Sequence, residues 1–356
     1  MKNELYIISS VFHLLIAIAV TSARPQCKPY FAFIRFNKAR YQHLIGCLNA
    51  IVQSSKQVLY LEDVPKGLKN RKLNALTLLK FVEEAGIKQV FVGNDRHIEF
   101  QYLAYCLKRS NISTECIYLD EGLFSYLGRK ASKSFSERIF DQGLKKIFYG
   151  FWWQTPKTIG ASSYIDEVWL AYPALACPVF QPKDTRQLPT EGFGSELFER
   201  FIECWAGLYE LPLSMGKADF VITITDEKNF VKFLNYRESI ITLVSILVKQ
   251  GKSVAIKYHP NANNRDLLSL QLISNRVTIL PSALPFEVLL PLLPKVTLIA
   301  EFSSTLITSR LLAPSMNVWA IVHESVSIQP ELVSLCKALA IQRYTIPELK
   351  QKVMGF

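Results

Sequence analysis

The sequence lacks the short patterns that mark the common metal and phosphate sites. Its seven cysteines include no C-x-x-C pair, and there is no H-E-x-x-H or G-x-x-x-x-G-K-[ST] motif. The stretch EGFGSE at residues 191–196 follows no predicted strand. These absences argue against a zinc site, a P-loop and a dinucleotide-binding loop.

The cysteines are also too scattered for a disulfide framework. They are odd in number and lie mostly among apolar residues, which is typical of buried thiols in a reducing compartment. We therefore expect a cytoplasmic protein.

A hydrophobic run of membrane-spanning length is missing as well. The most apolar stretch, near the N-terminus, is short for a span and is interrupted by Ser9, Ser10 and His13. It also lacks the basic region and cleavage site of a signal peptide in the expected order. We predict a strand, a turn and a helix here, and a membrane segment is the alternative.

Basic residues outnumber acidic ones by 41 to 30, which gives a formal charge of +11. Such a balance favours polyanionic partners: nucleic acid, nucleotide phosphates, acidic glycans or an anionic membrane surface. The basic residues are dispersed and no nucleic-acid-binding module is visible, so we expect no nucleic-acid partner.

The 356 residues are 49% hydrophobic and suffice for two domains. Short apolar runs alternate with amphipathic stretches of helical length, which predicts an α/β fold with two Rossmann-like parallel sheets. Domains are expected at residues 1–175 and 197–356, joined by a linker rich in proline and glycine at 176–196. Two such domains facing a central cleft form the arrangement called GT-B.

The predicted strands span residues 5–9, 30–35, 57–62, 89–93, 116–120 and 167–172 in the first half, and 219–225, 253–258, 276–281, 296–300 and 317–322 in the second. In open parallel sheets, ligands bind beyond the carboxyl ends of the strands. Polar residues that follow a strand are therefore site candidates.

His259 and Pro260 follow the strand at 253–258 directly, and Lys257 lies within its last residues. Proline disfavours the helical conformation in the residue before it, so His259 is expected to be extended with its ring in the cleft. An imidazole there can bind a phosphate or deliver a proton to a leaving group. The alternative is a histidine that caps a loop.

Asp120, Glu121 and Gly122 follow the strand at 116–120. Adjacent side chains on a strand point to opposite sides, so one carboxylate faces the cleft and can act as a general base. Gly122 permits a tight turn. The alternative is a solvated loop or a helix N-cap.

Ser303 and Ser304 lie where a helix is predicted to begin after the strand at 296–300. Hydroxyl and backbone N–H groups at a helix N-terminus form an anion site. Serine is also a common N-cap, so a structural role is the alternative.

Together these motifs resemble those of bacterial sialyltransferases, in the same order along nearly the whole chain. DEG at 120–122, HP at 259–260 and SS at 303–304 are similar to the D/E-D/E-G, HP and serine motifs of these enzymes. The group includes the lipooligosaccharide sialyltransferases of glycosyltransferase family 52 and the capsular polysialyltransferases. ISSVFHLLIA at 8–17 also resembles their N-terminal segment, although Val11 replaces a frequent proline.

The resemblance implies roles for these residues. Asp120 or Glu121 would deprotonate the acceptor hydroxyl, and the sequence does not say which. His259 would contact the phosphate of the CMP leaving group and act as an acid, and the two serines would hold the same phosphate. A glutamate that binds the ribose is also expected; Glu287 fits by position, and Glu301 is its competitor.

The implied activity is an inverting, metal-independent transfer of sialic acid from CMP-sialic acid to a hydroxyl of a bacterial surface glycan, a lipooligosaccharide or capsule. The first domain would bind the acceptor and the second the CMP-sugar. No cofactor or metal is expected, and no D-x-D metal clamp occurs. The alternatives are another CMP-activated keto-sugar donor, or a non-catalytic glycan-assembly scaffold.

An aromatic and basic stretch, GLKKIFYGFWWQTPK at 143–157, resembles an interfacial membrane anchor. It predicts peripheral contact with an anionic membrane, at the inner face of the bacterial inner membrane. Interdomain packing or a wall for acceptor stacking is the alternative.

Overall fold

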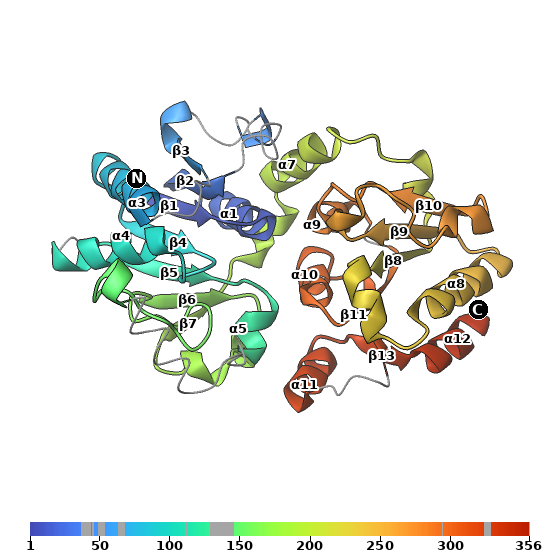
Figure 1. Ribbon diagram of the computed structural model, residues 1–356. Coiled ribbons are helices and arrows are strands. Elements are labelled where there is room, and N and C mark those ends of the chain that lie inside the picture. Colours follow the sequence, from blue (N-terminus) through green and yellow to red (C-terminus); the bar gives the residue numbers. More distant parts are fainter. Residues whose placement is uncertain are drawn as a thin grey trace. The chain divides into compact units, whose positions relative to one another are not determined.

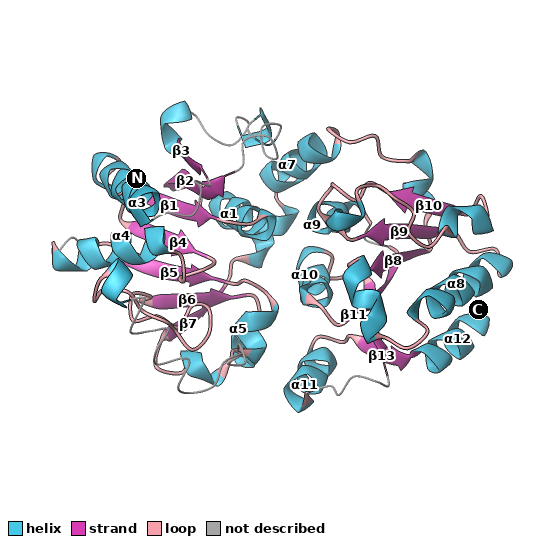
Figure 2. Ribbon diagram, viewed as in Figure 1, coloured by secondary structure: helices cyan, strands magenta, loops and turns pink. Residues whose placement is uncertain are grey.

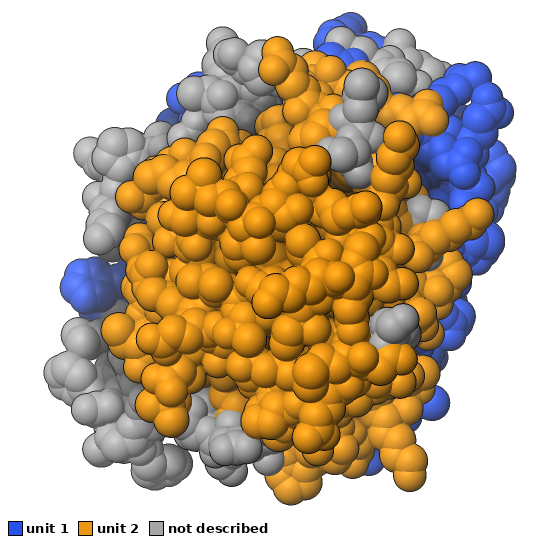
Figure 3. Space-filling view, turned by 90° about the vertical axis from the view of Figure 1, so that its right-hand side faces the viewer, with its two compact units in different colours: residues 1–201 blue, residues 202–356 orange. Residues whose placement is uncertain are grey.

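The computed structural model describes residues 1–36, 44, 46–48, 54–62, 68–110, 113–128, 146–293, 295–323 and 329–355 (Figures 1 and 2). The chain divides into two compact units, Met1–Phe201 and Ile202–Phe356, which are coloured separately in Figure 3.

The first unit is built on a parallel sheet with the strand order β3-β2-β1-β4-β5-β6-β7 among the described residues. Strand order reverses between β1 and β4, because the chain first adds strands on one side of β1 and then continues on the other. The strands are β1 (Lys2–Ile8), β2 (Cys27–Phe36), β3 (Val58–Glu62), β4 (Gln89–Val92), β5 (Glu115–Leu119), β6 (Glu167–Leu170) and β7 (Asp184–Gln187).

The N-terminal apolar stretch forms β1 followed by α1, as predicted. Ten consecutive residues of α1, Phe12 to Thr21, are buried, which explains why the helix is apolar on nearly every side. No helix among the described residues is long and apolar enough to cross a membrane. The helices of this unit are α1 (Val11–Ala23), α3 (Leu68–Glu84), α4 (Ile98–Arg109) and α5 (Leu123–Leu127), and α7 (Glu196–Ala206) spans the unit boundary.

The second unit repeats this plan with the strand order β10-β9-β8-β11-β12-β13, again parallel. Its order reverses between β8 and β11. The strands are β8 (Phe220–Ile224), β9 (Val254–Tyr258), β10 (Val277–Leu280), β11 (Thr297–Glu301), β12 (Asn317–Val322) and β13 (Gln342–Thr345).

Helices α8 and α12 pack against each other and cover one face of the second sheet (Figure 1). Their apolar residues join side chains of alternate strand positions, such as Ile222 and Ile224, in one core. α10 packs against α9 and β12. The helices are α8 (Tyr236–Lys249), α9 (Phe286–Leu289), α10 (Ser304–Leu312), α11 (Pro330–Ala338) and α12 (Ile346–Met354).

The predicted fold class is confirmed: the chain forms two Rossmann-like parallel-sheet units. The segment 176–196, expected to be a linker, differs from that expectation because it contains β7, which pairs in parallel with β6. The 3-10 turn at Thr190–Gly194 packs on α1 so closely that a Cβ on Gly192 would lie 1.9 Å from the Ala19 carbonyl oxygen. These contacts attach the segment to the first unit, whose boundary falls at Phe201.

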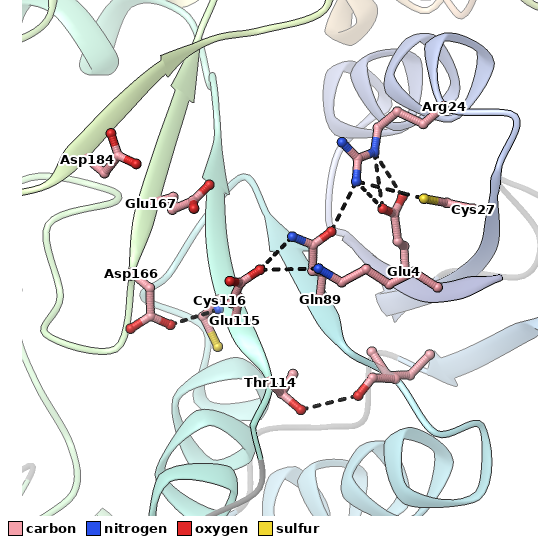
Figure 4. A network of polar contacts seen from close by, with 12 residues as sticks. Glu4, Arg24, Cys27, Gln89, Thr114, Glu115, Cys116, Asp166, Glu167 and Asp184 are labelled. Carbon is pink, nitrogen blue, oxygen red and sulfur yellow. Dashed lines mark hydrogen bonds and ion pairs between the residues drawn. The ribbon is translucent and has the colours of Figure 1, made fainter.

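A polar network joins the amino ends of three adjacent strands in the first unit (Figure 4). Glu4, Gln89 and Glu115 are register partners on β1, β4 and β5. Arg24, just after α1, donates from Nη2 to the buried Glu4 carboxylate (2.5 Å) and to the Gln89 side-chain oxygen (3.1 Å). Gln89 in turn donates to Glu115 (2.6 Å). The network therefore fixes α1 and β1 against β4 and β5.

Replacing Arg24 by Met should destabilise the protein strongly, because the buried Glu4 carboxylate would lose its cation. We expect the free energy of unfolding to fall by about 3 kcal/mol in urea titrations. The matched control is Arg200→Met, which breaks the exposed Arg200–Glu196 pair and should cost less than about 1 kcal/mol. Equal stability of the two variants would show that the network contributes nothing special.

Candidate functional site

Asp120 follows β5 and is a buried hydrogen-bond acceptor. Its carboxylate accepts from the backbone N–H of Gly122 (2.8 Å), from that of Ala171 (3.0 Å) and from the hydroxyl of Tyr126. Burial raises the pKa of Asp120, and these hydrogen bonds oppose the rise. With its oxygens engaged in joining β5, β6 and α5, Asp120 is suited to a structural role.

Glu121, the next residue, is less buried than Asp120. Its side chain keeps 20% of its surface exposed, whereas that of Asp120 is almost fully buried. The turn depends on Gly122, which caps α5 with a φ of +88°, a value that L side chains rarely adopt. Of the two carboxylates, Glu121 is the more accessible one.

His13 lies beside Glu121 and was not assigned a role from the sequence. Its Nε2 is 3.9 Å from Glu121 Oε1, and its Nδ1 is 3.0 Å from Ser9 Oγ. Because β1 and β4 flank the reversal of strand order, the turns after them lie next to each other, and Gly93 after β4 leaves room for the ring. The histidine and Gly93 are 80 positions apart, so no local pattern links them.

Asp95, which follows β4 by three positions, holds a loop. Its carboxylate accepts from the backbone N–H groups of Gly160 and Ser162, both at 2.8 Å. Burial raises the pKa of Asp95. It is fully buried, which indicates a structural role.

In the second unit, His259 follows β9 in the extended conformation predicted from Pro260, with φ −56° and ψ 145°. Its Nδ1 accepts from the backbone N–H of Asn261 (3.2 Å), so the ring caps the short turn that Pro260 begins. This contact assigns the proton of the neutral ring to Nε2. The side chain is 44% exposed, so both the loop-capping alternative and a ligand-binding role fit the same histidine.

Asp226, after β8, supports this histidine. Its Oδ2 lies 3.7 Å from His259 Nδ1 and accepts from Asn261 Nδ2 (2.6 Å). The hydrogen bond from Lys228 lowers the pKa of Asp226, and Asn261 adds to the effect. Asp226 and Asn261 together hold the turn that carries the His259 ring.

Ser303 and Ser304 are exposed at the N-terminus of α10. Ser303 occupies the N-cap position, yet its side chain makes no capping hydrogen bond. The hydroxyl therefore does not cap α10, and it lies next to the first turn, whose N–H groups lack partners within the helix.

Lys257 is buried, and its Nζ donates to the carbonyl oxygens of Tyr258 (3.1 Å) and Ser282 (3.0 Å). Burial lowers the pKa of Lys257 to about 8, and the charge of Glu287 opposes the shift. Glu287 is in the first turn of α9, and burial raises its pKa. Lys257 thus holds the ends of β9 and β10 together and attracts Glu287.

Glu301 ends β11 on the face covered by α8, where Tyr236 hydrogen-bonds to it. Burial raises the pKa of Glu301 to about 7. Glu287, only partly buried on the α9 side, is the better placed of the two glutamates for contact with a ligand. In the described part of the chain, no three His, Cys, Asp or Glu side chains form a group that could hold a metal ion.

The sequence matches the alpha-2,8-polysialyltransferase (POLYST) family over residues 4–321. The chain belongs to this family. It is therefore a glycosyltransferase, as predicted. No curated protein matches it.

Solved structures with low sequence identity share the fold. The UDP-GlcNAc 2-epimerase from Methanocaldococcus jannaschii aligns with a TM-score of 0.61 at 11% identity, covering 100% of this chain and 92% of its own. The Neisseria meningitidis UDP-GlcNAc 2-epimerase bound to UDP-GlcNAc aligns with a TM-score of 0.52 at 12% identity, covering 100% of this chain and 90% of its own. Phytolacca americana UGT2, complexed with UDP-2fluoro-glucose and pterostilbene, aligns with a TM-score of 0.52 at 10% identity, again covering 100% of this chain and 90% of its own. These likenesses establish a GT-B-like fold for this sialyltransferase-family chain.

Asp120→Ala should destabilise the protein, because it leaves the N–H groups of Gly122 and Ala171 and the Tyr126 hydroxyl without their acceptor. We expect a loss of about 3 kcal/mol in the free energy of unfolding. Glu121→Ala, the neighbouring control, should cost less than about 1 kcal/mol. The structural role of Asp120 is refuted if the two variants unfold at the same urea concentration.

Proposed function

We propose that this sialyltransferase-family enzyme transfers sialic acid from CMP-sialic acid to a glycan hydroxyl, with inversion at the anomeric carbon and without a metal ion. The observation that carries the proposal is the set of donor groups at the carboxyl edge of the second sheet. His259 presents Nε2–H after β9, and the exposed residues Ser303 and Ser304 carry hydroxyls at the start of α10.

These groups suit the phosphate of a CMP-sugar. The phosphodiester of a CMP-sugar accepts hydrogen bonds from hydroxyl, imidazole and backbone N–H donors, and the dipole of α10 favours its negative charge. We assign the ribose hydroxyls to Glu287, as its position in the sequence implied. Pro260 fixes the backbone that carries His259, and Lys257 acts indirectly by holding the strand ends.

The transfer step needs two proton transfers, and we assign one to a residue of each unit. The Glu121 carboxylate takes the proton of the acceptor hydroxyl while its oxygen bonds to the anomeric carbon. The bond from that carbon to the phosphate oxygen breaks, and CMP leaves with the electron pair. His259, whose Nδ1 lies 3.7 Å from the Asp226 carboxylate, donates a proton to the departing phosphate.

The acceptor is proposed to be a bacterial surface glycan of capsule or lipooligosaccharide type. The name of the family favours an acceptor that already ends in sialic acid. The formal charge of +11 supports this choice, because such a glycan is polyanionic.

Two sets of variants test the division of labour. Glu121→Gln should reduce kcat for transfer at least 100-fold, because it removes the base, and should leave the affinity for CMP unchanged. The double variant Ser303→Ala, Ser304→Ala should weaken CMP binding about tenfold in calorimetry, since it removes two phosphate donors.

Ser274→Ala is the control for the serine variant. Ser274 precedes β10 and so lies at the amino edge of the second sheet, opposite the edge at which Ser303 and Ser304 lie. It should bind CMP normally. Unaltered CMP affinity in the double variant rejects the phosphate site, and full transfer by Glu121→Gln rejects the base. Variants that bind CMP and keep their biological role without transfer would favour a scaffold. If the enzyme prefers a different CMP-activated keto-sugar, only the proposed donor changes and the residue roles stay as proposed.

We also propose a membrane contact through the described part of the aromatic stretch; residues 143–145 lie outside the described residues. Ile147, Phe148 and Phe151 are 80%, 62% and 93% exposed. Phe148 also lines a pocket of about 210 Å³ together with Lys72 of α3. Exposed aromatic rings beside lysines are typical of interfacial binding.

The tryptophans of this stretch behave differently from an interfacial anchor. Trp153 is buried, and Trp152 packs edge-on against Tyr102 of α4 at 5.3 Å between ring centroids. They attach the segment to its own unit, so the proposed contact is limited to the exposed side chains.

The double variant Phe148→Ser, Phe151→Ser should reduce co-sedimentation with phosphatidylglycerol vesicles at least fivefold, because it removes the two rings that would enter the interface. Leu272→Ser is the control, since Leu272 is an 86% exposed apolar residue of the other unit. Equal binding by both variants, or equal binding to neutral phosphatidylcholine vesicles, would contradict the proposed contact.

A further inference from the structure

We propose that His13 is a positioning residue for Glu121, presenting its Nε2–H to the carboxylate that acts as the base. The inference rests on the proposed function, in which Glu121 deprotonates the acceptor. It goes further because it assigns a task to a histidine in the first turn of α1, more than 100 positions before Glu121 in the sequence.

The ring of His13 is held from three sides. Its backbone N–H donates to Ser10 Oγ (3.2 Å), which caps α1, and its Nδ1 lies 3.0 Å from Ser9 Oγ. On the third side, an added Cβ at Gly93 would lie 2.3 Å from both Cδ2 and Nε2 of the ring. Any larger residue at position 93 would therefore displace the imidazole.

The second ring nitrogen, Nε2, is not engaged by Ser9 or Ser10. Nε2 is buried and has no hydrogen-bond partner among the described residues, while Glu121 Oε1 lies 3.9 Å away. That separation exceeds a hydrogen bond by less than 1 Å, so a small side-chain adjustment of Glu121 closes it. A buried polar atom without a partner is costly, which favours such an adjustment.

The protonation state decides what the ring can do. His13 is 3% exposed, and burial lowers its pKa to about 4. The ring is then neutral at physiological pH, so the pair is not a salt bridge. We assign the donor role in the Ser9–His13 contact to the Ser9 hydroxyl, which places the proton of the neutral ring on Nε2, the nitrogen nearer to Glu121.

A neutral N–H donor has the properties that a base needs from its neighbour. It orients the carboxylate and favours its ionised form, yet it supplies no full charge that would suppress proton uptake. Near this pair, Tyr118 is coupled electrostatically to Glu121, Asp120 and Asp95, and burial is the main cause that raises the pKa of its phenol.

Three replacements of His13 separate positioning from packing. His13→Gln can place an amide N–H near the former Nε2, His13→Asn places one near the former Nδ1, and His13→Phe keeps the ring shape without nitrogen. The measurement is kcat/KM for transfer against pH, together with CMP affinity and thermal unfolding of the full-length protein.

We expect His13→Phe and His13→Asn to lower kcat/KM about tenfold and to raise the pKa of its acidic limb by about one unit, because the carboxylate loses a donor. His13→Gln should stay within about threefold of the wild type. All three should bind CMP normally. If the Phe variant fails to unfold cooperatively, the comparison of Gln with Asn decides.

The inference is overturned if His13→Phe has the kcat/KM of the wild type, or if His13→Gln lowers kcat/KM as much as His13→Asn does. It is also overturned if the acidic limb of the pH profile does not shift. These outcomes are distinct from a failure of the proposed function. If Glu121→Gln transfers normally, Glu121 is not the base, whatever the His13 variants do. If Glu121→Gln is inactive and the His13 variants are normal, only the inference fails.

Discussion

The parallel direction of the strands is the constraint on which the rest of the structure depends. In each unit, every strand of the described sheet ends at the same edge, and the order of strands reverses once, at β1/β4 and at β8/β11. Polar groups that follow different strands are thereby brought together although they are far apart in the sequence. In the first unit, the opposite edge carries the Glu4–Arg24–Gln89 network, which is a second set of polar contacts at the amino ends of the same strands.

Burial separates residues that look equivalent in the sequence. Asp120, Asp95 and Lys257 all follow or end predicted strands, and in the structure each is buried with its polar atoms bonded to backbone groups. Glu121, His259 and Ser303 occupy comparable positions but keep exposed surface. A polar residue at a strand end is thus an equally good candidate for holding the fold and for binding a ligand, until its partners are known.

The sequence predicted the two-sheet fold and nearly every central strand, because buried parallel strands are continuous apolar runs. It missed β7 and β13, whose residues DTRQ and QRYT are largely exposed at the sheet edges and therefore lack that pattern. It could not choose between Asp120 and Glu121, since adjacent positions on a strand differ only in the side they face. The pairing of His13 with Gly93 and Glu121 is a contact across strands, which no local spacing reveals.

The central claim is that this chain of the polysialyltransferase family uses CMP-sialic acid without a metal ion. The most direct measurement is release of CMP, together with the mass of the product, from purified protein supplied with CMP-sialic acid and sialylated oligosaccharides in the presence of EDTA. The account predicts CMP release in step with addition of sialic acid, undiminished by the chelator. Turnover of UDP-sugars instead, or activity that disappears with EDTA and returns with a divalent cation, would contradict it.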